Sequence, residues 1–326
     1  MEKKRILSGL RPTGPLHLGH LVGDLRNWKE LQSEYECYYM VADWHALLSE
    51  YHDPRRIAEY TRTMAAEWVA CGLDPDQSAL FVQSRVPEHA ELFVILSTIT
   101  PIGWVERCPT YKEQLKELAA KDVNTYGFLG YPVLQAADIL LYRANAVPVG
   151  EDQLPHLEIT REIARRFNAL LGEVFPEPQA KLTRSSRLLG LDRRKMSKSY
   201  GNYIALAEDD KTIREKVMTM ITDPKRVRRA DPGHPDICNV HAYYEAFAPD
   251  KAAAVAEACR NATVGCADCK RQLAELLIEY LSPVRKRRAE LLENPKHVDD
   301  ILERGLKKAA KVAQETMRAV HKVLAF

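Results

Sequence analysis

The chain opens with the stretch RILSGLRPTGPLHLGH, which runs from Arg5 to His20. The apolar run Ile6–Leu10 predicts a buried strand, and the glycines and prolines after it predict a tight turn. After His17, apolar residues recur at the spacing of a helix. A strand, a tight loop and a helix in this order point free backbone N–H groups and a helix N-terminus at one place, which suits a phosphate group. An ordinary turn with two exposed histidines fits the same pattern.

The residues that follow alternate between strand-like and helix-like segments. Strands are expected over 37–42, 79–83 and 146–149, and helices over 54–71, 87–98, 131–142 and 154–170. Such alternation predicts an α/β fold with a doubly wound parallel sheet and right-handed crossovers. Residues 171–190 are expected to be mostly loop.

Beyond residue 206 the apolar pattern is helical throughout. Helices are expected over 209–221, 240–247, 251–259, 269–292 and 298–324. We therefore expect two domains, an α/β domain over residues 1–206 and a helical domain over residues 207–326.

The composition limits the class of protein. The 326 residues are 46% hydrophobic and 28% charged, which is ordinary for a globular protein. The sequence contains no uninterrupted apolar run of membrane-spanning length and no secretory leader, so we expect a cytoplasmic protein without a membrane span. The net charge of +2 means that a nucleic-acid partner would need local basic patches, such as residues 225–229 and 285–288.

Polar residues follow two of the expected strands, where ligands bind in doubly wound sheets. Asp43 and His45 come after the strand 37–42, and residues 150–153 (GEDQ) come after the strand 146–149. Gly150 would permit the close approach of a sugar or base, Asp152 could accept from a ribose hydroxyl, and Gln153 could contact a small substrate. Helix capping by Asp43 or by residues 151–152 is the alternative.

The expected helix 131–142 carries a polar stripe on an apolar background. Tyr131, Gln135 and Asp138 are spaced i, i+4 and i+7 and therefore share one face. Because a buried carboxylate and amide need partners, this face is a candidate pocket wall. A stripe that faces solvent is the alternative.

A second motif, KMSKS over Lys195–Ser199, places two lysines three residues apart in a serine-flanked loop. Together, the HLGH of residues 17–20 and this KMSKS resemble the paired signatures of class I aminoacyl-tRNA synthetases. The resemblance implies a Rossmann-like catalytic domain over 1–206 and an anticodon-binding helical domain over 207–326.

Four further stretches resemble the tryptophanyl-tRNA synthetases, and the resemblance covers most of the chain up to about Ile221. They are residues 8–14 (SGLRPTG), 43–46 (DWHA), 135–142 (QAADILLY) and 147–153 (VPVGEDQ), the last running on to Arg161. The rival is a tyrosyl-tRNA synthetase, because the spacing of Tyr131, Gln135 and Asp138 matches that family and many tryptophanyl enzymes have Met in place of Gln135. A non-catalytic, RNA-binding relative is a third reading, against which the intact motifs argue.

The resemblance implies that L-tryptophan is activated with ATP and transferred to tRNA(Trp), with release of AMP and pyrophosphate. It also implies bound Mg²⁺ and a homodimer, and no DNA partner. The implied catalytic residues are Lys195, Lys198, His17 and His20. The implied ATP-binding residues are Arg11, Pro12, Thr13, His17, Gly19, His20, Gly150, Glu151, Asp152, Leu188, Lys195, Met196, Ser197, Lys198 and Ser199. The implied tryptophan-binding residues are Leu7, His45, Tyr131, Gln135, Asp138 and Gln153, with Asp138 accepting the indole N–H.

Four late cysteines have the spacing of a metal site. Cys238, Cys259, Cys266 and Cys269 give the pattern C-x20-C-x6-C-x2-C, and zinc and a [4Fe–4S] cluster both accept four thiolates. Some bacterial tryptophanyl-tRNA synthetases carry a [4Fe–4S] cluster on a similar pattern whose first interval is slightly longer. The resemblance therefore favours the cluster, with zinc or free thiols as the alternatives and Cys238 as the ligand that fits least well.

Overall fold

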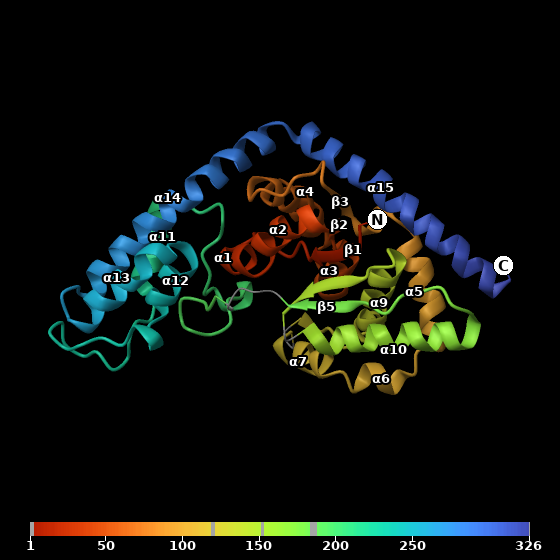
Figure 1. The fold of residues 1–326 in the computed structure, drawn as a ribbon, viewed down its shortest axis with the longest axis horizontal. Helices are drawn as coiled ribbons and strands as arrows, with labels where there is room; N and C mark the ends of the chain where they lie inside the picture. The colour runs from red at the N-terminus through yellow and green to blue at the C-terminus, as the bar shows by residue number, and fades with distance from the viewer. Residues whose placement is uncertain (1–2, 119–120, 151–152, 183–187, 326) are drawn as a thin grey trace. The chain divides into compact units, whose positions relative to one another are not determined.

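A computed structural model of the chain describes residues 3–118, 121–150, 153–182 and 188–325 (Figure 1). The strands are β1 (Arg5–Leu10), β2 (Glu36–Val41), β3 (Ser78–Val82), β4 (Ala146–Val149) and β5 (Gln179–Leu182). The helices up to β5 are α1 (Leu18–His20), η1 (Leu21–Leu25), α2 (Arg26–Glu34), α3 (Asp43–Glu50), α4 (Pro54–Ala70), η2 (Gln83–Arg85), α5 (Glu88–Ile99), α6 (Ile102–Glu106), α7 (Pro109–Glu117), α8 (Tyr126–Leu129), α9 (Tyr131–Leu141) and α10 (Leu154–Leu171). The later helices are η5 (Lys198–Tyr200), α11 (Asp210–Thr219), η6 (Pro235–Ile237), α12 (Asn239–Phe247), α13 (Pro249–Arg260), α14 (Cys266–Glu293) and α15 (Pro295–Leu324).

The five strands form one parallel sheet in the order β3-β2-β1-β4-β5. This order confirms the predicted α/β class and the doubly wound topology. It reverses direction between β1 and β4, and ligands of such sheets bind at this point, outside the carboxyl ends of the strands. Arg11 follows β1 and Gly150 follows β4, so the sheet places both residues at the switch point.

Strand β5 is an addition within residues 171–190, whose described part is otherwise mostly loop, as predicted. Gln179–Leu182 pairs in parallel with β4 over four residues. Each of its side chains is at least partly exposed, so the segment lacks the apolar alternation by which a strand is recognised. Only its pairing with β4 identifies it.

The first helix departs locally from α-helical geometry. Its expected helical spacing is confirmed, but Leu21–Leu25 form a π-helical segment between α1 and α2. Such segments are rare and are often found at functional sites. This one comes directly after the two motif histidines.

The described chain forms two compact units, each discontinuous in sequence. The first comprises Met1–Gly14, Asn27–Arg184 and Asn294–Phe326, and the second comprises Pro15–Arg26 and Ser185–Glu293. The boundary expected at residue 206 lies inside the second unit. The sequence places residues 294–326 in the helical domain, whereas here they belong to the first unit.

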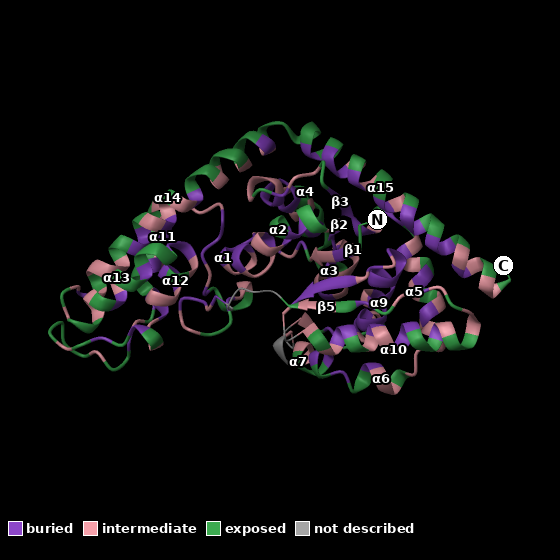
Figure 2. Cartoon of the chain, in the orientation of Figure 1, coloured by how far each residue is buried: buried purple, intermediate pink, exposed green. Residues whose placement is uncertain are grey.

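Helix α15 belongs to the first unit because one of its faces packs on the edge strand β3. Its buried residues form a stripe along the helix (Figure 2). The approach is closest at Gly305, where an added Cβ would lie 1.9 Å from the carbonyl oxygen of Leu80. A helix over an edge strand also prevents that strand from pairing with other chains.

The helices predicted beyond residue 206 all occur, with ends shifted by no more than three residues. In the second unit, α11, α12 and α14 bury apolar side chains that include Ile213, Tyr243, Leu273 and Leu277. Within the described residues, no helix is both long and apolar enough to span a bilayer.

Candidate functional site

The two synthetase-like motifs lie together in the second unit. The Leu18 N–H donates to the carbonyl oxygen of Ile204 (3.0 Å), and the Gly19 N–H donates to Sδ of Met196 (3.2 Å). A Cβ on Gly19 would lie 3.0 Å from the His17 ring and 3.2 Å from Sδ of Met196. Gly19 is therefore needed for the packing of one motif on the other.

Both motif histidines are held neutral. Burial, and then the positive charge of Lys198, lower the pKa of His17 to about 3. Burial, followed by the charges of His17 and Lys198, holds the pKa of His20 well below its usual value. The two rings stack with their centroids 3.8 Å apart. At neutral pH this site therefore takes its positive charge from lysine, and the histidines contribute hydrogen bonds.

The tautomer of His20 follows from its hydrogen bond. The backbone N–H of His17 donates to Nδ1 of His20 (3.2 Å). In a neutral ring that accepts at Nδ1, the proton is on Nε2. Nε2 of His20 can thus donate to a phosphate oxygen.

The loop that carries the lysines is held by Asn202, a residue that the sequence analysis did not select. Its Oδ1 accepts from the Ser197 N–H (2.8 Å), and its Nδ2 donates to Oδ1 of Asp192 (2.7 Å) and to the carbonyl oxygen of Lys195 (3.1 Å). Met196 is buried, whereas Lys195 and Ser199 are exposed. One buried amide thus sets the loop's shape while its first lysine faces solvent.

The low pKa of His17 has a measurable consequence. We expect the Cε1–H chemical shift of His17 to keep its neutral-ring value as the pH falls from 7.5 to about 4, because burial disfavours the charged ring. NMR titration measures this shift, and the signal missing from a His17→Asn spectrum assigns it. The pKa of His17 in the folded protein lies below its unfolded value of about 6.5. The stability that the neutral His17 ring contributes is therefore present above pH 6.5 and is lost as the pH falls towards about 3. A titration midpoint near 6.5 would contradict the burial argument.

In the first unit, the carboxylate of Asp138 lies at the centre of a buried network. Its Oδ1 accepts from Nε2 of Gln83 (2.8 Å) and from Nδ1 of His89 (2.6 Å), and its Oδ2 accepts from Nε2 of His45 (2.7 Å). Burial alone would raise the pKa of Asp138, but the charges and hydrogen bonds of His45 and His89 outweigh it and hold this pKa below its usual value. Asp138 is therefore an ionised acceptor with no exposed surface.

The structure thus brings together His45 and Asp138, two of the residues predicted for the amino acid. Leu7 is buried in the hydrophobic core of this unit, in one cluster with Ala42 and Val149. Gln83 and His89 are additions that the sequence analysis missed. Gln83 directly follows β3, so its place at the carboxyl end of a strand was the available signal.

Tyr131 and Gln153 belong to a separate network around the buried His156. Nε2 of His156 contacts the Tyr131 hydroxyl (2.7 Å) and Oγ1 of Thr110 (2.5 Å), and its Nδ1 contacts Oε1 of Gln153 (2.9 Å). Because Oε1 of Gln153 only accepts, Nδ1 carries the proton and Nε2 accepts from the hydroxyls. The sequence analysis did not give His156 a role.

The polar stripe of α9 is therefore divided. Tyr131 joins the His156 network and Asp138 joins the His45 network. Within α9, whose residues are all described, every side chain except that of Gln135 is buried. Asp43, the other candidate at the end of β2, accepts from the backbone N–H (3.0 Å) and the hydroxyl of Ser84, so it anchors η2.

The residues predicted to bind ATP divide between the two units. Arg11, Pro12, Thr13 and Gly150 are in the first unit. The second unit contains His17, Gly19, His20, Leu188, Lys195, Met196, Ser197, Lys198 and Ser199. Glu151 and Asp152 lie outside the described residues.

The four late cysteines gather in the second unit. Burial raises the pKa values of Cys238, Cys259 and Cys269, the last to about 12, and the charges of neighbouring cysteines add to each shift. Nη1 of Arg226 lies 4.0 Å from Sγ of both Cys259 and Cys266. Across the described residues, no three His, Cys, Asp or Glu side chains are arranged as a metal site. The thiols are thus close enough to affect one another's ionisation but do not form a coordination shell.

The predicted basic patches are partly used within the second unit. Nη2 of Arg226 donates to the carbonyl oxygen of Arg229 (2.6 Å). Arg285 donates to the carbonyl oxygen of Glu208 (2.9 Å) and pairs with Asp210 (2.7 Å). These two arginines stabilise local structure, which leaves less of each patch for a phosphate.

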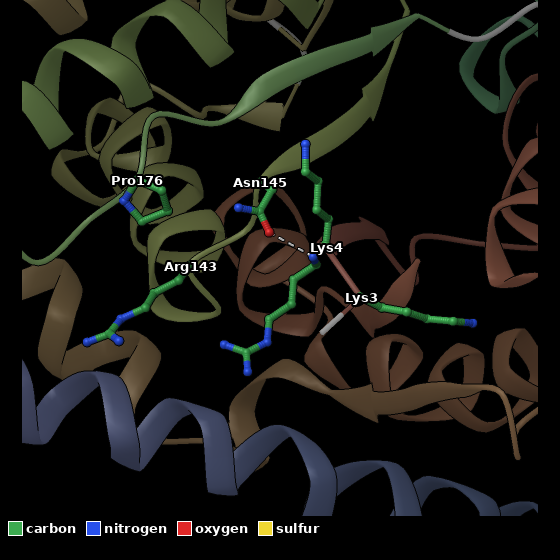
Figure 3. Close-up of a pocket in the computed structure, with 6 residues that line it drawn as sticks. Lys3, Lys4, Arg143, Asn145 and Pro176 are labelled. Atoms are coloured by element: carbon green, nitrogen blue, oxygen red, sulfur yellow. Dashed lines mark hydrogen bonds between the residues drawn. The ribbon is translucent and has the colours of Figure 1, made fainter. Parts of the chain in front are cut away.

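A basic cavity of about 360 Å³ lies beside the amino ends of β1 and β4, whereas the switch point is at the carboxyl ends of these strands (Figure 3). Its lining residues are Lys3, Lys4, Arg5, Arg143, Asn145 and Pro176. The Arg5 N–H donates to Oδ1 of Asn145 (2.9 Å), and the Arg5 guanidinium pairs with Glu36 (2.9 Å). The cavity contains none of the predicted site residues.

Comparison with known proteins identifies the family. Residues 1–282 match the family model of the class I tRNA synthetases (W and Y). The chain is 52% identical to the tryptophan–tRNA ligase of Thermotoga maritima over 323 residues, which cover 98% of both chains, and 43% identical to that of Ralstonia nicotianae, with 99% of both covered. Its fold matches the tryptophanyl-tRNA synthetase of Campylobacter jejuni, solved with ADP and tryptophan, at a TM-score of 0.89 and 34% identity, covering 99% of this chain and 100% of that one. The similarity extends over nearly the whole chain and agrees with the doubly wound sheet and the two motifs packed in one unit. The chain therefore belongs to the class I tRNA synthetases of the tryptophan and tyrosine family.

Proposed function

We propose that this chain is a tryptophan–tRNA ligase. It activates L-tryptophan with ATP to form tryptophanyl-adenylate and pyrophosphate. It then transfers the tryptophanyl group to the terminal ribose of tRNA(Trp) and releases AMP. The observation that carries the proposal is the 52% identity to a tryptophan–tRNA ligase over nearly the whole of both chains. We propose that the reaction takes place in the cytoplasm, where ATP and tRNA are available.

The reaction needs no nucleophile from the protein. The tryptophan carboxylate attacks the α-phosphorus of ATP, the new anhydride bond forms, and the bond to pyrophosphate breaks. The protein's contribution is therefore positioning and charge stabilisation. Lys195 and Lys198 neutralise the leaving pyrophosphate with Ser197 beside them, and the neutral His17 and His20 donate hydrogen bonds. Mg²⁺, which accompanies ATP, adds positive charge at the phosphates.

The remaining ATP contacts are assigned by motif position. Arg11, Pro12 and Thr13 follow β1, and Gly150 follows β4, on either side of the switch point of the sheet. Glu151 and Asp152 are proposed from the sequence alone. Met196 and Gly19 act through packing, because their contact joins the two motifs.

For the amino acid, we propose that Asp138 accepts the indole N–H, with Leu7, His45 and Gln135 around the ring. Tyr131 and Gln153, both held by His156, bind the α-amino and carboxylate groups. The two separate networks fit the two ends of one amino acid, since one offers a fixed carboxylate and the other a hydroxyl and an amide.

Amino-acid-dependent exchange of pyrophosphate into ATP tests the substrate. We expect exchange with tryptophan and none above background with tyrosine. Exchange with tyrosine would instead favour the tyrosyl reading of the spacing of Tyr131, Gln135 and Asp138. Correctly folded protein that binds tRNA but supports neither exchange nor charging would favour a non-catalytic RNA-binding role.

We further propose that Cys238, Cys259, Cys266 and Cys269 hold a [4Fe–4S] cluster, with zinc as the alternative. Four cysteines gathered in one unit, two of them beside the guanidinium of Arg226, match the thiolate preference of both groups. The bound group would cross-link η6, α13 and α14 and so fix the anticodon-binding region.

Metal analysis after anaerobic purification tests this site. We expect about four iron atoms per chain and an equal amount of labile sulfide, both lost in Cys269→Ser. The control variant Cys71→Ser, which changes a cysteine outside this group of four, should retain both the iron and the sulfide. About one zinc atom per chain in colourless protein would assign zinc, and protein without metal would remove the site.

We propose a homodimer because the family resemblance implies one, built through the catalytic domain. Val94 on α5, Ile102 on α6 and Tyr126 on α8, which belong to the first unit, are 61%, 63% and 84% exposed and are available for such a contact.

A further inference from the structure

The carboxylate proposed to read the indole N–H is already in contact with three protein donors. An ionised carboxylate offers about four acceptor positions, two on each oxygen. Gln83 and His89 occupy both positions on Oδ1 of Asp138, and His45 occupies one on Oδ2. Counting the described residues alone, one acceptor position remains, and it is on Oδ2.

We infer that Gln83 and His89 are positioning residues for tryptophan specificity: they hold Oδ1 of Asp138 so that the last acceptor position, on Oδ2, is the one offered to the indole N–H. The inference rests on the proposed function and deepens it, because it assigns specificity to two residues that need not touch the substrate.

The network fixes which nitrogen of His89 faces Asp138. The Tyr142 hydroxyl lies 2.9 Å from Nε2 of His89, while Nδ1 of His89 faces Asp138. Because Asp138 is held ionised and can only accept, Nδ1 must carry a proton and donate to it. The Tyr142 hydroxyl stays protonated because burial raises the pKa of Tyr142 far above its usual value. Hydrogen bonds therefore connect Tyr142 through His89 to Asp138.

Each residue of this hydrogen-bond network is on, or directly beside, a helix or strand. His89 is on α5, Asp138 and the adjoining Tyr142 are on and just after α9, and α5 packs directly against α9. Gln83 begins η2 at the end of β3. All four side chains are fully buried, with relative exposures of 0%. A site held in this way keeps its geometry without help from the ligand.

The physical consequence is selection for a donor. A fixed, ionised Oδ2 accepts from an indole N–H but finds no partner in a ring that lacks one, so the buried acceptor is then left unpaired. If Oδ1 were released, the carboxylate could rotate or bind a proton. Its remaining position would then no longer require a donor from the substrate.

The test compares tryptophan with 3-benzothienylalanine, in which sulfur replaces the indole N–H. The readout is the ratio of kcat/KM for the two amino acids in pyrophosphate exchange. We expect Gln83→Met, which keeps the length of the side chain, to reduce the wild-type ratio about tenfold through loss of activity with tryptophan. Tyr142→Phe, which removes only the hydroxyl that orients His89, should reduce it by a smaller factor. His89→Gln should reduce it at least as much as Gln83→Met.

Tyr38→Phe is the matched control. The ring of Tyr38 stacks on the ring of Tyr142 with centroids 4.9 Å apart. Its hydroxyl, however, donates to Glu36 and takes no part in the hydrogen bonds that link Tyr142, His89 and Asp138. We expect its ratio to be unchanged. Equal loss with both amino acids in Gln83→Met and Tyr142→Phe would show a merely structural role and overturn the inference.

The activity of the wild-type enzyme distinguishes a failure of this inference from a failure of the proposed function. Wild-type enzyme that uses tryptophan but does not prefer it over 3-benzothienylalanine would overturn the inference and leave the proposed function intact. Wild-type enzyme that does not use tryptophan would overturn the proposed function itself. If Gln83→Met fails to fold, Tyr142→Phe still decides, because it removes one oxygen and leaves the ring in place.

Discussion

Replacing Lys198 with alanine is expected to lower kcat for tryptophan-dependent pyrophosphate exchange by about 10²–10³-fold, with little change in KM for tryptophan. Lys198 is close enough to His17 and His20 to lower the pKa of both. Because those rings are neutral, the loss of Lys198 removes positive charge that no nearby histidine can replace. When the charge of the leaving pyrophosphate is not compensated, the barrier of the chemical step rises. We expect little change in KM for tryptophan because Lys198 is proposed to contact the phosphates and not the amino acid.

Lys211→Ala is the control for that measurement. Lys211 is also in the second unit, but its side chain is 85% exposed and its nearest acid, Glu215, lies 3.9 Å away. We expect wild-type exchange from this variant. A Lys198→Ala enzyme with unchanged kcat would show that the KMSKS loop has no role in charge stabilisation.

Replacing Asp138 with asparagine is expected to lower kcat/KM for tryptophan about 10²-fold, because the substrate loses a hydrogen bond to a charged group. Asp138→Ala should also destabilise the fold, since it leaves three buried donors from His45, His89 and Gln83 without a partner. Each unpaired donor costs about 1–3 kcal/mol. Exchange kinetics and urea unfolding measure the two effects.

The stability difference between wild type and Asp138→Asn should depend on pH. The folded pKa of Asp138 lies below its unfolded value of about 3.9. The ionised group therefore stabilises the fold above that value, and the contribution disappears as the pH falls through the folded pKa. Asp76→Asn, which removes a surface pair with Arg304, should change stability by less than about 1 kcal/mol and leave exchange intact. Full tryptophan activity in Asp138→Asn would refute the assignment of Asp138 to the indole.

Some residues of the candidate site could be predicted from the sequence and others could not, and the difference has a physical reason. His17, Gly19, His20 and the KMSKS loop are contiguous motifs, so each is visible without knowing the fold. Gln83, His89 and His156 were missed because each contacts a residue far from it in sequence, such as Asp138, which lies 55 residues from Gln83 and 49 from His89. A lone polar residue gives no sign of such a partner. Asn202 contacts nearby residues in the same loop, but its role depends on the folded shape of that loop.

The sequence by itself determined the α/β class, the central strands and the later helices, because apolar periodicity is a local property that survives in isolation. Only the tertiary structure decided that β5 is a strand, since its exposed residues are ordered by pairing with β4. Tertiary packing also decided that α15 covers β3, which depends on Gly305 having no side chain where it meets Leu80. In the same way, burial made the motif histidines neutral and made Asp138 a fixed acceptor, because desolvation and hydrogen-bond geometry exist only once distant segments are brought together.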